Sequence, residues 1–346
     1  MPLTLKLVCC HYFYLLHTLH RHPIRDSNTM AAFWKQCTDP RCSYFLYVAI
    51  FIAGVARIMW LLSFPVGQAP EFAEIPPSPK AWPSTGDVSA CGTGDGSAFK
   101  KRSRFAVASL LSGAAEEYVT YAYKLGVSLG YFVDVDMILL LPNGASNHST
   151  AAYAKLETVG WRKCFVPALG SQDQHYLYTK LAAWNLNYEA VLMIDLDTLV
   201  VGDISPLFDF FPALLRRTGA LIAAVRDHPE HWSPRWTAAG DRFNAGVMLL
   251  LPDPGLYRWL VDGMSRIQYD DGMLEQAYLN AALRQRYMPL PLEYNAVIII
   301  AYAEPMTWAR VLDKIKIVHF TYPKPHRPQL CKEYNMVDIC RLWVNS

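Results

Sequence analysis

The sequence has almost no excess of charge and lacks several patterns that mark common classes of protein. Over 346 residues the formal net charge is only +2, and no stretch interleaves basic with aromatic residues, so we expect no nucleic-acid partner. No Cys-x-x-Cys pair occurs, which argues against a zinc-finger type of site. No internal repeat is visible. With 52% hydrophobic residues, the chain can nevertheless bury a sizeable core.

One segment has very little charge. Residues 43–64, SYFLYVAIFIAGVARIMWLLSF, contain Arg57 as their one charged residue. The run is long enough to cross a bilayer as a helix, and it is apolar on all sides, unlike an amphipathic core helix. A cleaved signal peptide is the alternative, but 42 residues precede the run unless translation starts at Met30. We therefore expect a single-pass transmembrane signal anchor at 43–64.

The charges on either side of this run predict its orientation. Residues 1–42 carry five basic and two acidic side chains, whereas residues 65–99 carry one basic and four acidic. The positive-inside rule then makes 1–42 a cytosolic tail and places everything after residue 64 in the lumen. Residues 65–103 are rich in Pro, Gly and Ser and predict an extended stem. Residues 104–346 are expected to form the lumenal globular domain.

Two further features depend on this lumenal placement. Cys331 and Cys340 close a short loop, and an oxidising lumen makes a disulfide between them plausible. Asn147 begins an Asn-His-Ser glycosylation sequon in a polar stretch.

Two Asp-x-Asp triplets occur, where about one is expected by chance in a chain of this composition. Asp134 and Asp136 precede an apolar run, so we interpret them as a solvated entry to a strand. Asp195 and Asp197 follow the apolar run VLMI, and their side chains share a face of the strand. Open α/β sheets bind ligands beyond the carboxyl ends of their strands, so this second pair predicts a ligand or metal site.

Strand and helix patterns alternate along the globular domain. Apolar runs typical of buried strands alternate with helix-period segments, which predicts an α/β fold with a mixed, mostly parallel sheet and helices on both faces. The expected strands are RFAVASLL, MILLLPN, CFVPAL, VLMIDLD, NAGVMLLLP and KIKIVHF, and the expected helices include residues 114–129, 149–160, 176–187, 257–267 and 275–285.

Six short motifs in collinear order resemble the retaining glycosyltransferases of family 8, the relatives of glycogenin and of plant glucuronosyltransferases. The resemblance covers residues 104–327 and rests on TKLAAWNL, VLMIDLDTLVVGDISPLFD, FNAGVMLL, EQAYLN, LPLEYNA and KIVHFTYPKP. It implies a GT-A fold, a UDP-sugar donor and a Mn²⁺ (or Mg²⁺) ion. A divalent ion would neutralise both the acid pair and the leaving diphosphate.

The resemblance also implies roles for individual residues. The metal ligands would be Asp195, Asp197 and His319, and Gly246 would permit close approach of the backbone to the donor sugar. The implied catalytic residues are Gln276, Glu275 and Lys180. The implied donor-binding residues are Leu110, Tyr118, Lys180, Asp195, Leu196, Asn244, Ala245 and Lys324.

The sequence departs from the family pattern at two places. Glu275 stands where relatives often have Asp, and the stretch HFTYPKPH has Tyr322 and His326 where the usual Gly and Trp would be. The second departure alters the loop that would wrap the diphosphate. The segment 226–242 is expected to select the sugar, which the sequence does not reveal.

These features together predict a Golgi type II membrane protein that transfers a hexosyl unit with retention to a glycan or glycolipid acceptor. We expect a front-face mechanism, because the residue beneath the sugar, Gln276, is an amide and no pair of flanking carboxylates is evident. A self-glucosylating primer and a non-catalytic lumenal binding protein are the alternatives. A homodimer is possible.

Overall fold

A computed structural model describes Cys91 and residues 101–112, 115–144, 149–171, 176–227, 242–269 and 271–346. All of them lie in the second of the two compact units into which the chain divides, Glu74–Ser346. The predicted anchor at 43–64 and the sequon at Asn147 lie outside the described residues. Among the helices of the described ranges, none is long and apolar enough to cross a membrane.

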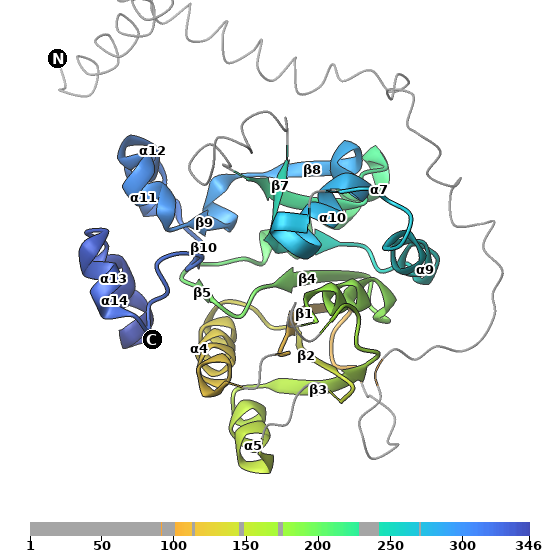
Figure 1. The fold of residues 1–346 in the computed structure, drawn as a ribbon, viewed down its shortest axis with the longest axis horizontal. Coiled ribbons are helices and arrows are strands. Elements are labelled where there is room, and N and C mark those ends of the chain that lie inside the picture. The colour runs from red at the N-terminus through yellow and green to blue at the C-terminus, as the bar shows by residue number, and fades with distance from the viewer. Residues whose placement is uncertain are drawn as a thin grey trace, which may run out of the picture. The chain divides into compact units, whose positions relative to one another are not determined.

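A seven-stranded mixed sheet forms the centre of the domain, in the order β3-β2-β1-β4-β7-β6-β8 (Figure 1). Neighbouring strands are parallel except where β7 pairs with β4 and with β6. The strands are β1 (Phe105–Leu110), β2 (Asp136–Pro142), β3 (Trp161–Val166), β4 (Ala190–Ile194), β6 (Ile222–Arg226), β7 (Phe243–Leu250) and β8 (Tyr287–Leu290). The predicted mixed, mostly parallel sheet is confirmed.

Successive side chains of each strand point to opposite faces of the sheet, so apolar residues lie on both faces. Helices cover both faces and bury these residues in two separate cores. Val107 and Leu192 face a core that contains α4, whereas Ala108 and Met193 face a core that contains η2 and α10. The helices of this part are α4 (Glu116–Phe132), α5 (Thr150–Thr158), η2 (Leu177–Asn185), α6 (Pro206–Asp209), α7 (Phe211–Thr218), α9 (Pro254–Gly263), η4 (Asp271–Met273), α10 (Leu274–Leu283) and η5 (Arg284–Arg286).

A second, three-stranded sheet lies beside the first and consists of β5 (Thr198–Val200), β10 (Ile317–His319) and β9 (Ala296–Val297). Strand β10 is antiparallel to β5, with His319 opposite Thr198, and parallel to β9. This pairing brings a strand from late in the chain against the residues that follow β4. The remaining helices are η6 (Leu292–Tyr294), α11 (Ile299–Ala303), α12 (Pro305–Val311), η7 (Leu312–Lys314), α13 (Pro328–Glu333) and α14 (Val337–Asn345).

The helix expected at 176–187 is a 3₁₀ helix, η2. It starts after Tyr176, whose φ of 51° lies in the left-handed region, and its turns close with bonds such as Thr179 N–H to Tyr176 C=O at 2.9 Å. Side chains three residues apart align in a 3₁₀ helix. Leu177 and Lys180 therefore line the same cavity.

The first acid pair is not a solvated strand entry, because only Asp134 is exposed. Asp136 is 3% exposed and ion-pairs with Arg162 on β3 at 3.1 Å. It also accepts hydrogen bonds from Tyr188 Oη and the backbone N–H of Arg102, both at 2.9 Å. Sequence position alone could not reveal this, since all three partners are distant in the chain.

Two disulfides stabilise the domain. Cys331–Cys340 joins α13 to α14, a pairing that the sequence made plausible but did not decide. Cys91–Cys164 was not foreseen, and it attaches Cys91 to β3. Residues 101–103 also contact the domain, where the N–H groups of Arg102 and Ser103 bind Asp136. The predicted stem, 65–103, therefore includes residues that are bound to the globular domain.

Candidate functional site

The site forms where the two sheets meet. Strand β4 ends at Ile194. The backbone N–H of Asp195, the next residue, donates a hydrogen bond to the C=O of Gly246 at 2.8 Å and so fixes the backbone there. The C=O of Asp197 accepts the N–H of Phe320 at 2.8 Å, directly after β10. The β5–β10 pairing therefore carries His319 to the acid pair although more than 120 residues separate them in sequence.

The three predicted metal ligands converge. His319 Nε2 lies 3.3 Å from Asp197 Oδ1 and 3.9 Å from Asp195 Oδ2. One ligand atom from each of the three residues lies within 4.8 Å of the others. His319 is buried, while the two carboxylates are partly open to the cavity. Their arrangement thus presents two oxygens and one nitrogen to a common point.

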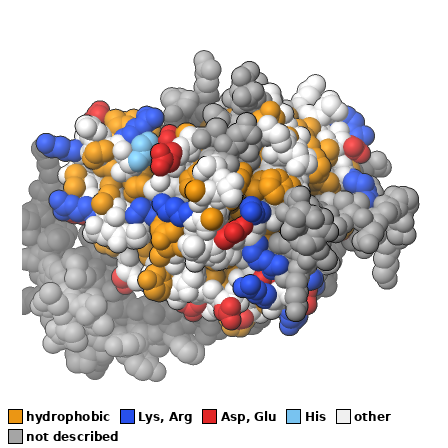
Figure 2. Space-filling view, turned by 90° about the horizontal axis from the view of Figure 1, so that it is seen from below, with side chains coloured by type: hydrophobic (Ala, Val, Ile, Leu, Met, Phe, Trp, Pro, Cys, Tyr) orange, Lys and Arg blue, Asp and Glu red, His pale blue; other side chains and the backbone are white. Residues whose placement is uncertain are grey.

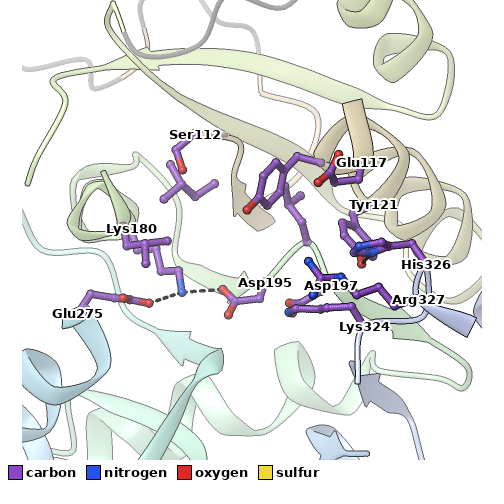
Figure 3. Close-up of a pocket in the computed structure, with 14 residues that line it drawn as sticks. Ser112, Glu117, Tyr121, Lys180, Asp195, Asp197, Glu275, Lys324, His326 and Arg327 are labelled. Atoms are coloured by element: carbon purple, nitrogen blue, oxygen red, sulfur yellow. Dashed lines mark hydrogen bonds and ion pairs between the residues drawn. The ribbon is translucent and has the colours of Figure 1, made fainter. Parts of the chain in front are cut away.

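Two lysines neutralise the carboxylates of the site. Lys180 Nζ binds Asp195 Oδ1 at 2.7 Å and Glu275 Oε1 at 2.6 Å, so it lies between them (Figure 3). Lys324 Nζ forms an ion pair with Asp197. Three carboxylates and two ammonium groups leave one net negative charge on these five side chains. A divalent cation would make this set positive overall, which suits a diphosphate.

A solvent-open cavity of about 350 Å³ lies in front of these groups. Figure 3 shows Lys180 and Glu275 on one side of it, and Tyr121, Lys324, His326 and Arg327 on the other, with the acid pair between. Eight residues named from the sequence line it: Leu110, Tyr118, Lys180, Asp195, Leu196, Asp197, Glu275 and Lys324. Their individual roles stay predictions.

Three other predicted residues do not line this cavity but lie in a buried network behind it. Gln276 Oε1 accepts the N–H of Ala245 at 2.9 Å, and Gln276 Nε2 donates to Asp227 Oδ2 at 2.9 Å. Asn244 Nδ2 donates to Asp227 Oδ1 at 3.2 Å. The structure thus unites Asn244, Ala245 and Gln276 through Asp227, which sequence reasoning missed.

Sequence reasoning also missed several residues that line the cavity. Glu117 and Tyr121 lie on α4 beside Tyr118, and their helical spacing could have revealed them. His326 and Arg327 follow Lys324 directly. The other two are Ser112 and Leu177. Most of the segment 226–242, expected to select the sugar, lies outside the described residues.

Burial and charge pairing act against each other on the ionisable groups. Burial alone would lower the pKa of Lys180, but Asp195 and Glu275 outweigh it and raise that pKa, so the ammonium stays charged. Burial would raise the pKa of Asp197, yet the ammonium of Lys324 holds it well below its usual range. Burial raises the pKa of the Tyr121 hydroxyl, and the charge of Asp197 adds to this effect.

The site has the chemistry and space for a divalent metal. Two carboxylates and an imidazole form a mixed set that suits Mn²⁺ better than Ca²⁺. A Cβ at Gly246 would clash with the His319 ring and crowd Asn244 Oδ1. Gly246 therefore permits a close approach of the His319 ring, while its predicted approach to the donor sugar stays a prediction.

Comparison with known proteins agrees with this geometry. The profile of Glycosyl transferase family 8 matches residues 148–326, more than half of the chain. Galactinol synthase 4 of Arabidopsis thaliana is 29% identical over 161 residues, which cover 41% of this chain and 47% of that protein. Glycogenin-1 of Saccharomyces cerevisiae (strain YJM789) is 22% identical over 258 residues, covering 63% and 40% of the two chains.

Among solved structures, the galactosyltransferase LgtC in complex with donor and acceptor sugar analogues is similar with a TM-score of 0.49 and 17% identity. The match covers 67% of this chain and 94% of that one. The chain spans about half the length of the galactinol synthases that it matches. The family profile matches a range that includes Asp195 and Asp197 and extends to His326, and this match decides the family to which the chain is assigned. This chain belongs to glycosyltransferase family 8.

Proposed function

We propose that the protein is a Mn²⁺-dependent retaining glycosyltransferase with a GT-A fold that moves a hexosyl unit from a UDP-sugar to a glycan or glycolipid acceptor. The observation that carries the proposal is the convergence of Asp195, Asp197 and His319 beside a cavity whose wall bears Lys180 and Lys324. Mg²⁺ is the alternative ion. Family membership supports sugar transfer, and the combination of two carboxylates with one imidazole supports the metal.

The basic residues of the cavity match the needs of a nucleotide diphosphate. Lys324, His326 and Arg327 come from one short loop and line one wall. Charge-assisted hydrogen bonds from such groups would hold the phosphates and stabilise the charge that develops when the sugar departs. Tyr118 and the backbone of Leu110 are expected to contact the base. A bound divalent ion would add further stabilisation of the leaving diphosphate.

The contacts of the residues beneath the expected sugar position favour a front-face mechanism. Glu275 is ion-paired with Lys180, and the carbonyl oxygen of Gln276 accepts the N–H of Ala245. Both groups are therefore engaged, and neither is arranged as a nucleophile. The leaving phosphate itself would take the proton of the acceptor hydroxyl while the new bond forms on the same face.

We place this activity in the secretory pathway, in a Golgi membrane, with the catalytic domain in the lumen. The apolar run at 43–64 and the charge asymmetry around it support a type II anchor. Two disulfides in the described domain also support an oxidising compartment.

A donor screen tests the proposal. The full chain, solubilised in detergent, is incubated with UDP-glucose, UDP-galactose, UDP-glucuronate or UDP-N-acetylglucosamine, with and without Mn²⁺, and release of UDP is measured. We expect hydrolysis of at least one donor only with the ion. Asp197→Asn should reduce it by about 100-fold or more, because the carboxylate would hold the ion that neutralises the leaving diphosphate.

Asp134→Asn is the matched control, because Asp134 belongs to the other Asp-x-Asp triplet and is exposed. This variant should keep wild-type activity. Release of UDP from no donor would favour a non-catalytic binding protein, and a mass increase of the chain itself after incubation would favour a self-glucosylating primer.

A further inference from the structure

Behind the candidate metal site, a chain of buried amides connects His319 to the backbone of β7. His319 Nδ1 lies 2.9 Å from Asn295 Oδ1, and Asn295 Nδ2 lies 2.8 Å from Asn244 Oδ1. The same Asn244 oxygen accepts the N–H of Gly246 at 2.9 Å. Asn295 is 0% exposed and Asn244 is 6% exposed, so water does not substitute for these bonds.

The orientation of each side-chain amide in this network follows from two partners whose hydrogen-bonding roles are fixed, the backbone N–H of Gly246 and the carboxylate of Asp227. A backbone N–H can only donate, so the atom of Asn244 that faces Gly246 must be its oxygen. The other end of Asn244 faces the carboxylate of Asp227, which requires the amide nitrogen there. Both constraints give the same orientation of Asn244, so its amide is not free to flip.

The orientations of Asn295 and His319 then follow. Because Asn244 offers an oxygen, Asn295 must present its nitrogen to it and its own oxygen to His319. That oxygen needs a donor, so Nδ1 of His319 carries a proton. In the neutral imidazole the other nitrogen, Nε2, is then bare. It is Nε2 that faces Asp195 and Asp197.

We propose that Asn295 is a positioning residue that holds His319 in the tautomer whose bare Nε2 faces the metal. The inference rests on the proposed function, since it concerns the same metal site. An imidazole free in water prefers the opposite tautomer, with the proton on Nε2, and that form cannot bind a metal through Nε2. Outer hydrogen-bond partners of this kind typically change metal affinity by about 10–100-fold when they are removed.

The test compares two substitutions of Asn295 in the full chain. Asn295→Leu has a similar size but offers no acceptor, so Mn²⁺ affinity, measured by electron paramagnetic resonance of the free ion, should fall by about 10–100-fold. Asn295→Asp keeps an oxygen facing Nδ1 while it disturbs the bond to Asn244. Its Mn²⁺ affinity should therefore stay closer to that of the wild type.

If Asn295 had a merely structural role, the order of the two Mn²⁺ affinities would differ, because Asn295→Asp would damage the network at least as much as Asn295→Leu does. Equal losses in the two variants, or none in Asn295→Leu, would overturn the inference. Asn280→Leu is the control: Asn280 is also buried and bonds Phe243 N–H and C=O, but it does not touch His319. It should lower stability and leave Mn²⁺ affinity unchanged; a loss equal to that of Asn295→Leu would contradict us.

The tautomer itself can be read without a metal. In the metal-free wild type, ¹⁵N NMR of the His319 ring should show a proton on Nδ1. A proton on Nε2 beside a bare Nδ1 would refute the inference directly. If the wild type bound no Mn²⁺ at all, the proposed function would fail, and this spectrum would still decide the role of Asn295.

Discussion

At the scale of single residues, the site depends on pairing charges that are removed from water. Lys180 has a side chain only 5% exposed and touches both Asp195 and Glu275. Each buried charge is costly without its partner, so the three side chains stabilise one another. The sequence could predict Lys180, Asp195 and Glu275 through their motifs, but it could not reveal that a single ammonium connects them.

Removal of this ammonium should strongly destabilise the domain. In Lys180→Met, Asp195 and Glu275 would lie close together without their shared cation, and we expect a loss of about 3–5 kcal/mol in the free energy of unfolding. Chemical denaturation followed by circular dichroism measures it.

Lys163→Met is the matched control, because Lys163 binds Glu157 at 2.8 Å on the surface. An exposed pair of this kind contributes about 0–1 kcal/mol. Similar losses in the two variants would show that burial does not govern the energetics of the site.

Other residues of the network could not be predicted because their signal is purely spatial. Asn295 lies in the motif LPLEYNA, and Asp227 directly follows β6 in the segment 226–242, but nothing in the sequence showed that either side chain joins this network. They become recognisable only when β9, β10 and β7 bring Asn295, His319 and Asn244 together. Sequence reasoning therefore named eight of the residues that line the cavity and missed the others, and in the network behind the cavity it named Asn244 but missed Asn295 and Asp227.

At the scale of elements, the long buried strands and five of the helices could be predicted from the period of their apolar residues. The runs at β1, β2, β4 and β7 are long, buried and bounded by turns, so local pattern and final structure agree. The β5–β10 pairing could not be predicted, since both strands have only three residues and lie far apart in sequence. It is nevertheless this pairing that brings His319 to the two aspartates and completes the candidate set of metal ligands.

Asp136 shows how one side chain can connect several elements. It binds Arg162 on β3, Tyr188 before β4 and the backbone N–H of Arg102 before β1. Burial alone would raise the pKa of Asp136, but these donors together hold it below its usual value. Its contribution to stability is therefore present above the unfolded-chain pKa of about 3.9, and it is lost as the pH falls through the lower, folded-state value.

Asp136→Asn should reveal this pH dependence. At pH 7 we expect a loss of about 2–3 kcal/mol, because charge-assisted bonds to a buried carboxylate are replaced by weaker ones. Urea denaturation at pH 7 and pH 3 should show a smaller difference from the wild type at the lower pH. Asp134→Asn, at an exposed position, should match the wild type at both; a constant deficit in Asp136→Asn would contradict the account.

At the scale of the whole molecule, the domain is larger than the stretch that its apolar pattern marks. Cys91 is bonded to Cys164 and residues 101–103 contact Asp136, so a fragment that begins at residue 104 would lose both attachments. The sequence could not show this, because a Pro- and Gly-rich composition says nothing about which cysteine pairs with which.

The surface of the described domain is mixed in charge. On the face shown in Figure 2, basic and acidic side chains are interspersed with apolar patches. The cationic side chains that matter for the proposed reaction are those that line the cavity, Lys180, Lys324 and Arg327.

We infer that a divalent ion held by side chains at the ends of β4 and β10 would join the donor to the protein. The most direct test is anomalous diffraction at the manganese edge. It uses crystals of the protein grown with Mn²⁺ and either a UDP-sugar or UDP. We predict one strong peak within bonding distance of Asp195, Asp197 and His319 Nε2, with the diphosphate on its other side. A nucleotide bound with no such peak, while Lys180 and Lys324 still hold the two aspartates, would contradict the account.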